Sequence, residues 1–118
     1  MTRGEIYWAN LAPRSGSEQT GRRPVIILSH DAFNQTPGWR SIIVIPVTTS
    51  SAQARRGPTV VPLKAGSAGL VTDSHALCHQ ITTLDRAKLT DRIGRLPDDL
   101  LAIIEKALLA AVDIRKTG

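Results

Sequence analysis

The most restrictive feature of the sequence is a run of apolar, largely β-branched residues near its middle, from Ser41 to Val47. A short run of this kind favours a central, buried strand. Pro46 has no N–H to donate, so we expect a bulge or the end of the strand there. A second run, from Val25 to Ser29, follows Pro24 and has the same character. The sequence therefore predicts two buried strands within a sheet.

Further short segments with β-forming residues flank these two runs, and turn signals containing proline or glycine separate them. Five to seven short strands followed by a helix predict a mainly β (α+β) fold, in the form of a small, strongly bent antiparallel sheet or barrel. We expect further strands at residues 5–10, 59–63, 70–71 with 74–81, and 91–96, helical turns at 30–34 and 83–89, and loops at 11–22 and 48–58.

The only long helix is predicted at the end of the sequence, over about residues 97–116. Pro97 suits the first helical position, and Asp98 and Asp99 lie where the positive end of the helix dipole favours carboxylates. Apolar residues recur at helical spacing and form one apolar face of the helix. This face is wider than a helix needs in order to cover a small sheet. We therefore expect part of that face, or the edge of the sheet, to be buried in a second subunit.

Size and charge limit the kinds of protein that this chain can be. Its 118 residues suit a single domain, residues 1–118, and its formal net charge of +5 favours an anionic partner such as nucleic acid or an acidic protein. One cysteine, Cys78, allows neither an internal disulfide nor a cysteine-built metal site, and we expect it to be a packed core residue. The first residues lack a signal-peptide apolar region, and no apolar run is long enough for a bilayer. We therefore expect a cytoplasmic protein with no membrane contact.

A polar, cationic segment precedes the strand that begins near Val25. The residues from Gly16 to Pro24 include two glycines, a carboxylate, an amide and the paired arginines Arg22 and Arg23. Loops attached to rigid strands often present functional groups. A solvated hairpin loop is the simpler interpretation when this segment is taken alone.

The three histidines, His30, His75 and His79, do not form a metal-ligand pattern. His75 and His79 are four residues apart in a predicted strand and would project from the same face, but no carboxylate lies at a suitable spacing. We interpret them as surface or hydrogen-bonded histidines. The sequence contains neither a phosphate-binding loop motif nor a Gly-x-Ser-x-Gly elbow. We therefore expect no metal and no cofactor.

Arginine and threonine side chains flank the central strands and could act together on a phosphate. An arginine can hold a phosphate at two points and stabilise charge that develops on it, and a threonine hydroxyl can add a hydrogen bond. This pairing suits metal-free cleavage of a phosphodiester in which the 2′-OH of RNA is the attacking group. DNA lacks that hydroxyl, so RNA is the natural substrate of such a reaction.

Five short segments, in the same order and spread over nearly the whole chain, resemble the MazF/PemK family of toxin endoribonucleases. The resemblance is to its MazF-like branch. The matching segments are Arg3 to Trp8, Gly16 to Gln19 with Arg23 to Val25, Pro46 to Thr48, Gln80 with Thr83 to Asp85, and Leu89 to Ile93.

This resemblance implies a fold, an activity and partners. The fold would be an SH3-like barrel with a C-terminal helix, assembled as a homodimer. The activity would be metal-independent, sequence-specific cleavage of single-stranded RNA to 2′,3′-cyclic phosphate and 5′-hydroxyl ends, which inhibits translation and growth. The partner would be an acidic cognate antitoxin that occupies the RNA groove, as in a type II toxin–antitoxin system.

The resemblance also implies roles for individual residues. In the MazF branch, the arginine before the proline and the threonine after the third strand carry catalysis, and these fall on Arg23 and Thr48. Arg23 would stabilise the negative charge of the transition state. A further candidate role of Arg23 is proton donation to the leaving 5′-oxygen. Thr48 would position the scissile phosphate. His79 stands where many MazF relatives have glutamate, and is either a general base or a bystander that contacts RNA. The residues expected to bind RNA are Ser17, Glu18, Gln19, Arg22, Ser50 and Gln80.

The chain departs from the PemK branch at its catalytic positions. PemK relatives have an arginine and an aspartate on either side of the cysteine, where this chain has Leu77 and His79, and a first-loop histidine where it has Ser17. The MazF-type pair is therefore the expected one. Two alternatives stay open: a CcdB-like toxin that binds a topoisomerase without enzymatic activity, and a degenerate relative that only binds nucleic acid or antitoxin.

Overall fold

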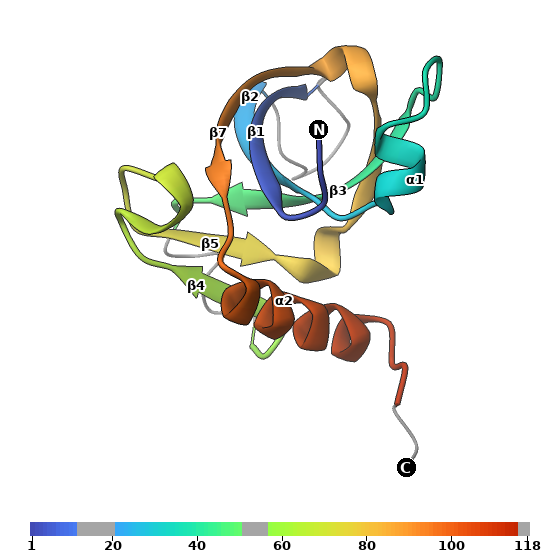
Figure 1. The fold of residues 1–118 in the computed structure, drawn as a ribbon. Helices are drawn as coiled ribbons and strands as arrows, with labels where there is room; N and C mark the ends of the chain where they lie inside the picture. Colours follow the sequence, from blue (N-terminus) through green and yellow to red (C-terminus); the bar gives the residue numbers. More distant parts are fainter. Residues whose placement is uncertain (12–20, 51–56, 116–118) are drawn as a thin grey trace.

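The computed structural model of the protein describes residues 1–11, 21–50 and 57–115, and within them seven strands and one long helix (Figure 1). The strands are β1 Glu5–Leu11, β2 Gly21–Ile27, β3 Ser41–Thr48, β4 Val60–Leu63, β5 Ser74–Leu77, β6 Thr82–Asp85 and β7 Leu89–Arg95. The helices are α1 Asp31–Asn34 and α2 Asp98–Ala111, and the 3-10 turns are η2 Ser67–Gly69, η3 Cys78–Gln80 and η4 Arg86–Lys88.

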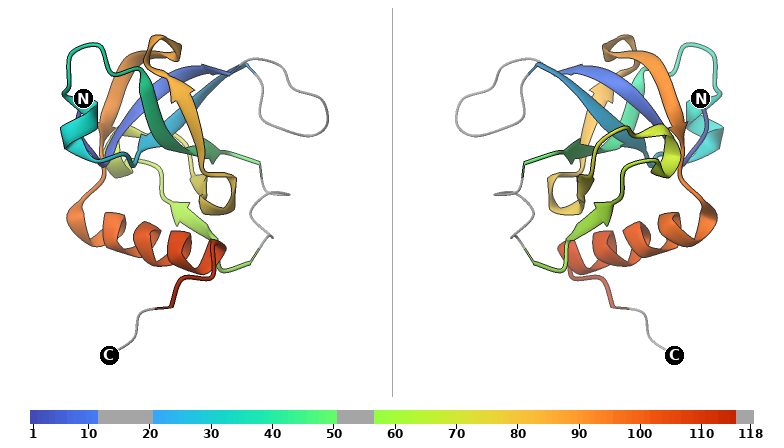
Figure 2. Two further views of the ribbon diagram at one scale, coloured as in Figure 1. Left: turned by 90° about the vertical axis from the view of Figure 1, so that its right-hand side faces the viewer. Right: turned by 90° about the vertical axis from the view of Figure 1, so that its left-hand side faces the viewer.

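The strands form one antiparallel sheet in the order β4-β5-β3-β2-β1-β7, with β6 paired to β3 as well. The sheet curls strongly, and α2 lies across one end of it (Figure 2). Within the described residues no ladder joins β4 to β7, so the sheet is bent but not closed. The predicted mainly β fold, a strongly bent antiparallel sheet with a C-terminal helix, is confirmed.

Strand β3 is the central element, as its apolar sequence predicts. One of its edges pairs with β2 through residues 44–46. Its other edge pairs with β6 through residues 41–44 and with β5 through residues 47–48. Strand β3 has a partner on both edges, and from Val44 onward its side chains are buried, whereas Ser41 and Ile43 near its start are exposed. This burial explains why nearly every position in it is apolar.

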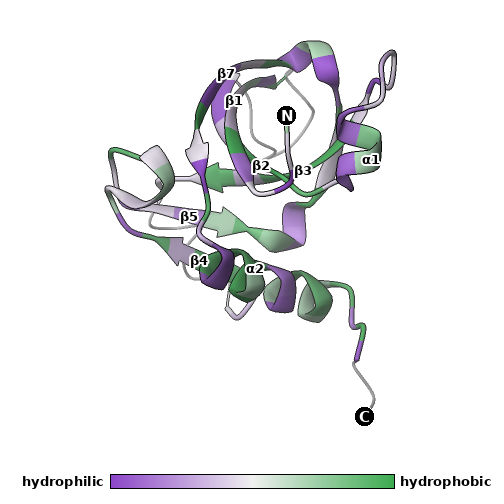
Figure 3. Cartoon of the chain, in the orientation of Figure 1, coloured by the Kyte–Doolittle hydropathy of each residue, from purple (hydrophilic) through white to green (hydrophobic). Residues whose placement is uncertain are grey.

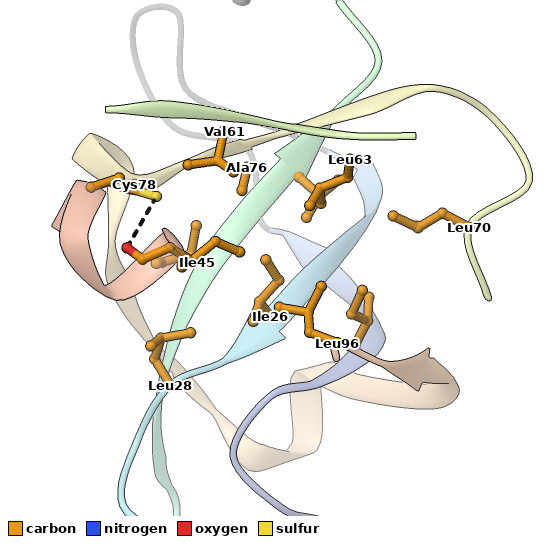
Figure 4. Packing of buried hydrophobic residues seen from close by; sticks show 13 residues of the cluster. Ile26, Leu28, Ile45, Val61, Leu63, Leu70, Ala76, Cys78 and Leu96 are labelled. Carbon is orange, nitrogen blue, oxygen red and sulfur yellow. Dashed lines mark hydrogen bonds between the residues drawn. The ribbon is translucent and has the colours of Figure 1, made fainter. Parts of the chain in front are cut away.

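Two hydrophobic cores lie on the two faces of this sheet. Even-numbered residues of β3, Ile42 and Val44, enter one core, which also contains Val25 of β2. Odd-numbered residues such as Ile45 enter the other core, which is shown in Figure 4. Ile104 of α2 packs into this second core. The alternation follows from the two-residue period of a strand. Strand β3 is accordingly coloured as hydrophobic along much of its length in Figure 3.

Helix α2 is shorter than predicted and only partly buried. It begins at Asp98 and ends at Ala111, rather than near residue 116, and Pro97 is its N-cap. Ile104 and Ala107 are its buried residues. Several apolar side chains in or just beyond it are about half exposed: Ile103 at 52%, Val112 at 50% and Ile114 at 57%. Apolar side chains therefore remain exposed in the helix and just after its end. Among the described residues, no helix is long and apolar enough to cross a membrane.

Two predicted elements are wrong in type. The expected strand over residues 74–81 ends at Leu77, and the chain turns through η3 before it continues. The expected helical turn over residues 83–89 is reduced to η4, because Thr82–Asp85 pairs with the first half of β3 as strand β6. Asp85 then caps η4 by accepting a hydrogen bond from the backbone N–H of Ala87. Pairing with a distant strand has overridden local preference at both positions.

Strand β2 begins at Gly21, four residues before the predicted start. Its pairing with β1 extends outward from the core, with Trp8 opposite Pro24 and Leu11 opposite Gly21. The paired arginines therefore belong to the strand and not to a loop. Since successive side chains of a strand point to opposite faces, Arg22 and Arg23 face opposite sides of the sheet.

Glu5 ties the start of β1 to β7 and to the N-terminus. Its carboxylate, 11% exposed, accepts hydrogen bonds from the Arg92 guanidinium and the backbone N–H of Thr2. Burial by itself would raise the pKa of Glu5, but the bonds from Arg92 and Thr2 outweigh it and hold that pKa below its ordinary value. The unfolded chain therefore binds this proton more tightly than the folded one.

We expect Glu5→Gln to lower the free energy of unfolding at pH 7 by about 2 kcal/mol, because it removes the charged acceptor of Arg92. Glu5 stabilises the fold fully above its unfolded pKa near 4.5, and this stabilisation is lost as pH falls through the lower folded value. The difference between variant and wild type should therefore shrink below pH 4.5. Urea denaturation at several pH values measures it, and a constant difference down to pH 3 would contradict this role.

Candidate active site

Facing residues on five strands form a continuous row across one face of the sheet. Arg23 of β2 is opposite Ala9 of β1, and His75 of β5 is opposite both Thr48 of β3 and Pro62 of β4. Residues directly opposite in an antiparallel pair project from the same face. We call these five residues, Ala9, Arg23, Thr48, His75 and Pro62, the cross-strand row.

The register between β2 and β3 joins the two halves of this row. Val25 is opposite Pro46, which is the last pair of that ladder. Because the two strands run in opposite directions, the next residues on this face beyond that pair are Arg23 on β2 and Thr48 on β3. The side chains of Arg23 and Thr48 therefore project from the same face of neighbouring strands, as Val25 and Pro46 do.

Arg23 is half-buried, and its guanidinium forms no ion pair with any described carboxylate. Its Nε atom is buried and has no hydrogen-bond partner within the described part of the chain. Arginine cannot lose its charge in a protein, so this group carries a positive charge and an unused donor. An anion that enters the row would satisfy both.

Arg22 has a different environment on the opposite face of β2. It is exposed, its Nη2 atom lies 2.8 Å from Asp91 Oδ2, and its guanidinium stacks 4.4 Å from the centroid of the Trp8 ring. These contacts hold β2 against β1 and β7. The structure therefore separates Arg22 from the cross-strand row, although the two arginines are adjacent in sequence.

Thr48 lies at the end of β3 and is 4% exposed. Its Oγ1 atom accepts a hydrogen bond of 3.1 Å from the backbone N–H of Ser50. A hydroxyl that accepts one hydrogen bond still has its own hydrogen to donate. Thr48 is therefore held in place and retains a donor, while Ser50 is exposed beside it.

His75 is a member of the row that the sequence does not single out. It is half-buried, and its Nδ1 atom is buried without a partner among the described residues. Its position opposite Thr48 depends on the pairing of two strands that are far apart in the sequence. Local pattern identifies no such pairing, so the interpretation of His75 as an ordinary surface or hydrogen-bonded histidine missed it.

His79 and Gln80 lie on η3, after the end of β5. His79 is exposed, and its Nδ1 atom lies 3.1 Å from the Thr59 hydroxyl. The prediction that His75 and His79 project from one face of one strand is wrong, because the strand ends between them. The ladders of β5 end at Leu77, so neither His79 nor Gln80 belongs to the cross-strand row.

Other residues singled out by the sequence have different outcomes. Cys78 is buried as expected, with its Sγ 3.9 Å from the backbone carbonyl of Ile104 (Figure 4), and burial raises its pKa to about 11. Its thiol is therefore protonated at neutral pH. Within residues 1–11, 21–50 and 57–115, no group of three potential ligands is arranged to hold a metal ion. The expected RNA-binding residues Ser17, Glu18 and Gln19 lie outside the described residues.

Together these features define a small, bent antiparallel β protein with a cationic row of side chains suited to a phosphate group. The chain matches the model of the family described as "PemK-like, MazF-like toxin of type II toxin-antitoxin system" over residues 2–112. That match covers almost every element of the fold. The protein therefore belongs to the PemK-like, MazF-like family of type II toxins.

Individual relatives agree with this assignment. The chain is 36% identical over 116 residues to the endoribonuclease EndoA of Bacillus subtilis, covering 96% of this chain and 97% of the relative. It is 34% identical over 114 residues to the endoribonuclease MazF6 of Mycobacterium tuberculosis, covering 97% and 98%. Its fold matches MazF from a MazE–MazF structure of Deinococcus radiodurans with a TM-score of 0.74 and 28% identity, covering 98% and 97%.

Proposed function

We propose that this toxin is a metal-independent endoribonuclease that cleaves single-stranded RNA at preferred sequences. The observation that carries the proposal is the position of Arg23 beside Thr48 on one face of neighbouring strands. Curated relatives named endoribonucleases, similar over nearly their whole length, support the same activity. The excess of positive charge on the chain favours an anionic polymer as substrate.

The reaction requires charge stabilisation at the phosphate. The 2′-oxygen attacks phosphorus, the bond from phosphorus to the 5′-oxygen breaks, and the products carry 2′,3′-cyclic phosphate and 5′-hydroxyl ends. The Arg23 guanidinium stabilises the negative charge that builds on the phosphate oxygens, and its unpartnered Nε supplies a donor. The Thr48 hydroxyl holds a non-bridging oxygen and so positions the phosphate.

Other polar residues would bind the rest of the RNA strand. Ser50 follows Thr48 and is exposed, so it suits a contact with the neighbouring phosphate. Gln80 and His79 on η3 suit contacts with a base edge or the backbone. Arg22 would have to leave Asp91 and Trp8 to reach RNA on the opposite face, and we assign it a structural role.

The cellular partners follow from family membership and from the surface. As a type II toxin, the protein would be held inactive in the cytoplasm by an acidic cognate antitoxin, and its release would inhibit translation and growth. We propose that it works as a homodimer. Ile103 of α2 and Val112 just after it are half-exposed apolar residues that a second subunit can cover.

We expect purified protein to cut a mixed RNA pool at the same sites and at the same rate with and without EDTA. The reaction as proposed needs no metal, because an arginine and a hydroxyl provide the electrostatic stabilisation. Sequencing of the cut ends, with a chemical test for cyclic phosphate, measures the outcome. A folded protein that leaves all RNA intact would favour a CcdB-like toxin that binds a topoisomerase, or a relative that only binds nucleic acid or antitoxin.

A further inference from the structure

Two buried side-chain atoms without a hydrogen-bond partner occur among the described residues, and both belong to the cross-strand row. They are Nε of Arg23 and Nδ1 of His75. Buried polar atoms almost always have a partner in folded proteins, so each exception requires an explanation. Two exceptions on one row of one sheet face suggest a ligand that approaches both.

The two residues that carry these atoms lie on strands on either side of Thr48. Thr48 is directly opposite His75 on β5, and the β2 register places Arg23 on the other side of it. Thr48 still has a hydroxyl hydrogen to donate, because its known bond is one that it accepts from Ser50. A phosphate held by the Thr48 hydroxyl would therefore have a guanidinium on one side and an imidazole on the other.

We propose that His75 is the general base that removes the proton from the 2′-OH of the RNA. This inference rests on the proposed endoribonuclease function. Displacement at phosphorus places the attacking and leaving oxygens roughly in line, on opposite sides of the phosphorus atom. With Thr48 at the phosphate and Arg23 on the leaving-group side, the attacking oxygen lies on the His75 side.

The proposed step is balanced in atoms and charge. A neutral ring nitrogen of His75 accepts the 2′-OH proton as the 2′-oxygen forms its bond to phosphorus. The bond from phosphorus to the 5′-oxygen breaks, and that oxygen takes a proton from water on the Arg23 side. Proton loss from the imidazolium to solvent restores the neutral histidine. Imidazole suits this role because it can accept and release a proton near neutral pH.

The surroundings of His75 agree with this role. The strands packed against β5 are β3 and β4, and the residues that face His75 from them are Thr48 and Pro62, neither of which titrates. Arg23, one strand further along, is the charged member of the row. His79 is placed differently, because it is exposed on η3 and its Nδ1 atom lies 3.1 Å from the Thr59 hydroxyl.

The test compares His75→Ala and His75→Gln with His30→Ala and the wild type, under single-turnover conditions on one RNA oligonucleotide. Both His75 variants should cleave about 10²-fold or more slowly, which is the usual contribution of a general base. His30→Ala is the control, because His30 is an exposed histidine at the start of α1 and lies outside the cross-strand row, and this variant should cleave within a few-fold of wild type. Circular dichroism and RNA binding show whether each variant keeps its fold and its substrate.

Added imidazole distinguishes proton transfer from a structural role. Added imidazole should restore part of the cleavage rate of His75→Ala and leave the rate of His30→Ala unchanged. A wild-type rate in His75→Gln, which keeps a polar side chain but accepts no proton, would overturn the inference. So would a folded, RNA-binding His75→Ala variant whose lost rate imidazole does not restore. Wild-type protein that leaves RNA uncut would instead overturn the proposed function itself.

Discussion

Replacing Arg23 by alanine should slow RNA cleavage by about 10²- to 10³-fold or more, because it removes a positive charge and several donors from the site of developing charge. RNA binding should weaken far less, since the other proposed RNA contacts, at Ser50 and Gln80, are kept. Arg23 forms no ion pair with a described carboxylate, and its Nε has no described partner. Its loss should therefore leave the free energy of unfolding nearly unchanged. Single-turnover cleavage and urea denaturation of the same preparation measure both effects.

Arg22→Ala is the matched control for this prediction, because it removes the same side chain from the adjacent position on the opposite face of β2. Its ion pair with Asp91 is exposed, so its loss should cost less than about 1 kcal/mol of stability. The cleavage rate should stay within a few-fold of wild type. Equal losses of activity in the two variants would mean that net charge, and not the cross-strand row, controls cleavage.

Gly94→Ala should produce a large loss of stability from a single methyl group. Gly94 of β7 packs against η2, and a Cβ at this position would lie 2.0 Å from the carbonyl oxygen of Ala68 and 2.6 Å from its carbonyl carbon. Both atoms are backbone, so they cannot move aside as a flexible side chain could. We expect the free energy of unfolding to fall by about 3 kcal/mol or more.

Gly66→Ala is the control for this second prediction. Gly66 has a φ of +89°, but a Cβ there meets nothing within 4 Å. Only the backbone cost of a left-handed conformation remains, about 1 to 2 kcal/mol. Thermal and urea denaturation should therefore show that Gly94→Ala is much less stable than Gly66→Ala. The reverse order would show that the contact between η2 and β7 is looser than described.

Much of the fold could be predicted from the sequence because it depends on local pattern. The apolar run from Ser41 to Val47 favours a central, buried strand, and β3 is that strand. Pro97 and the acidic residues after it identified the start of α2. Turn residues separated most of the short strands.

The errors come from pairing between distant segments. Thr82–Asp85 forms strand β6 because it pairs with the first half of β3, and a local view of that segment favours a turn. The pairing of β1 with β2 turns a predicted loop into a strand and sends Arg22 and Arg23 to opposite faces. Such pairing is specified by the whole chain, so a short window of sequence carries little information about it.

The candidate site likewise combines residues that the sequence identifies with a residue whose position depends on strand pairing. Arg23 and Thr48 were found through resemblance to a family, and their place on one face follows from strand register. His75 was missed, because its position opposite Thr48 exists only once β3 and β5 pair. Ser17, Glu18 and Gln19 remain predictions, since they lie outside the described residues.

The central claim is that Arg23 and Thr48 act on one phosphate, and a double-mutant cycle tests it most directly. Cleavage rates are measured for Arg23→Ala, Thr48→Val and the double variant, each shown to be folded. Groups that act as a unit are strongly non-additive, so we expect the double variant to be no more than about threefold slower than the slower single variant. A double variant slowed by the full product of the two single effects would mean that the two side chains act independently, and would contradict this account.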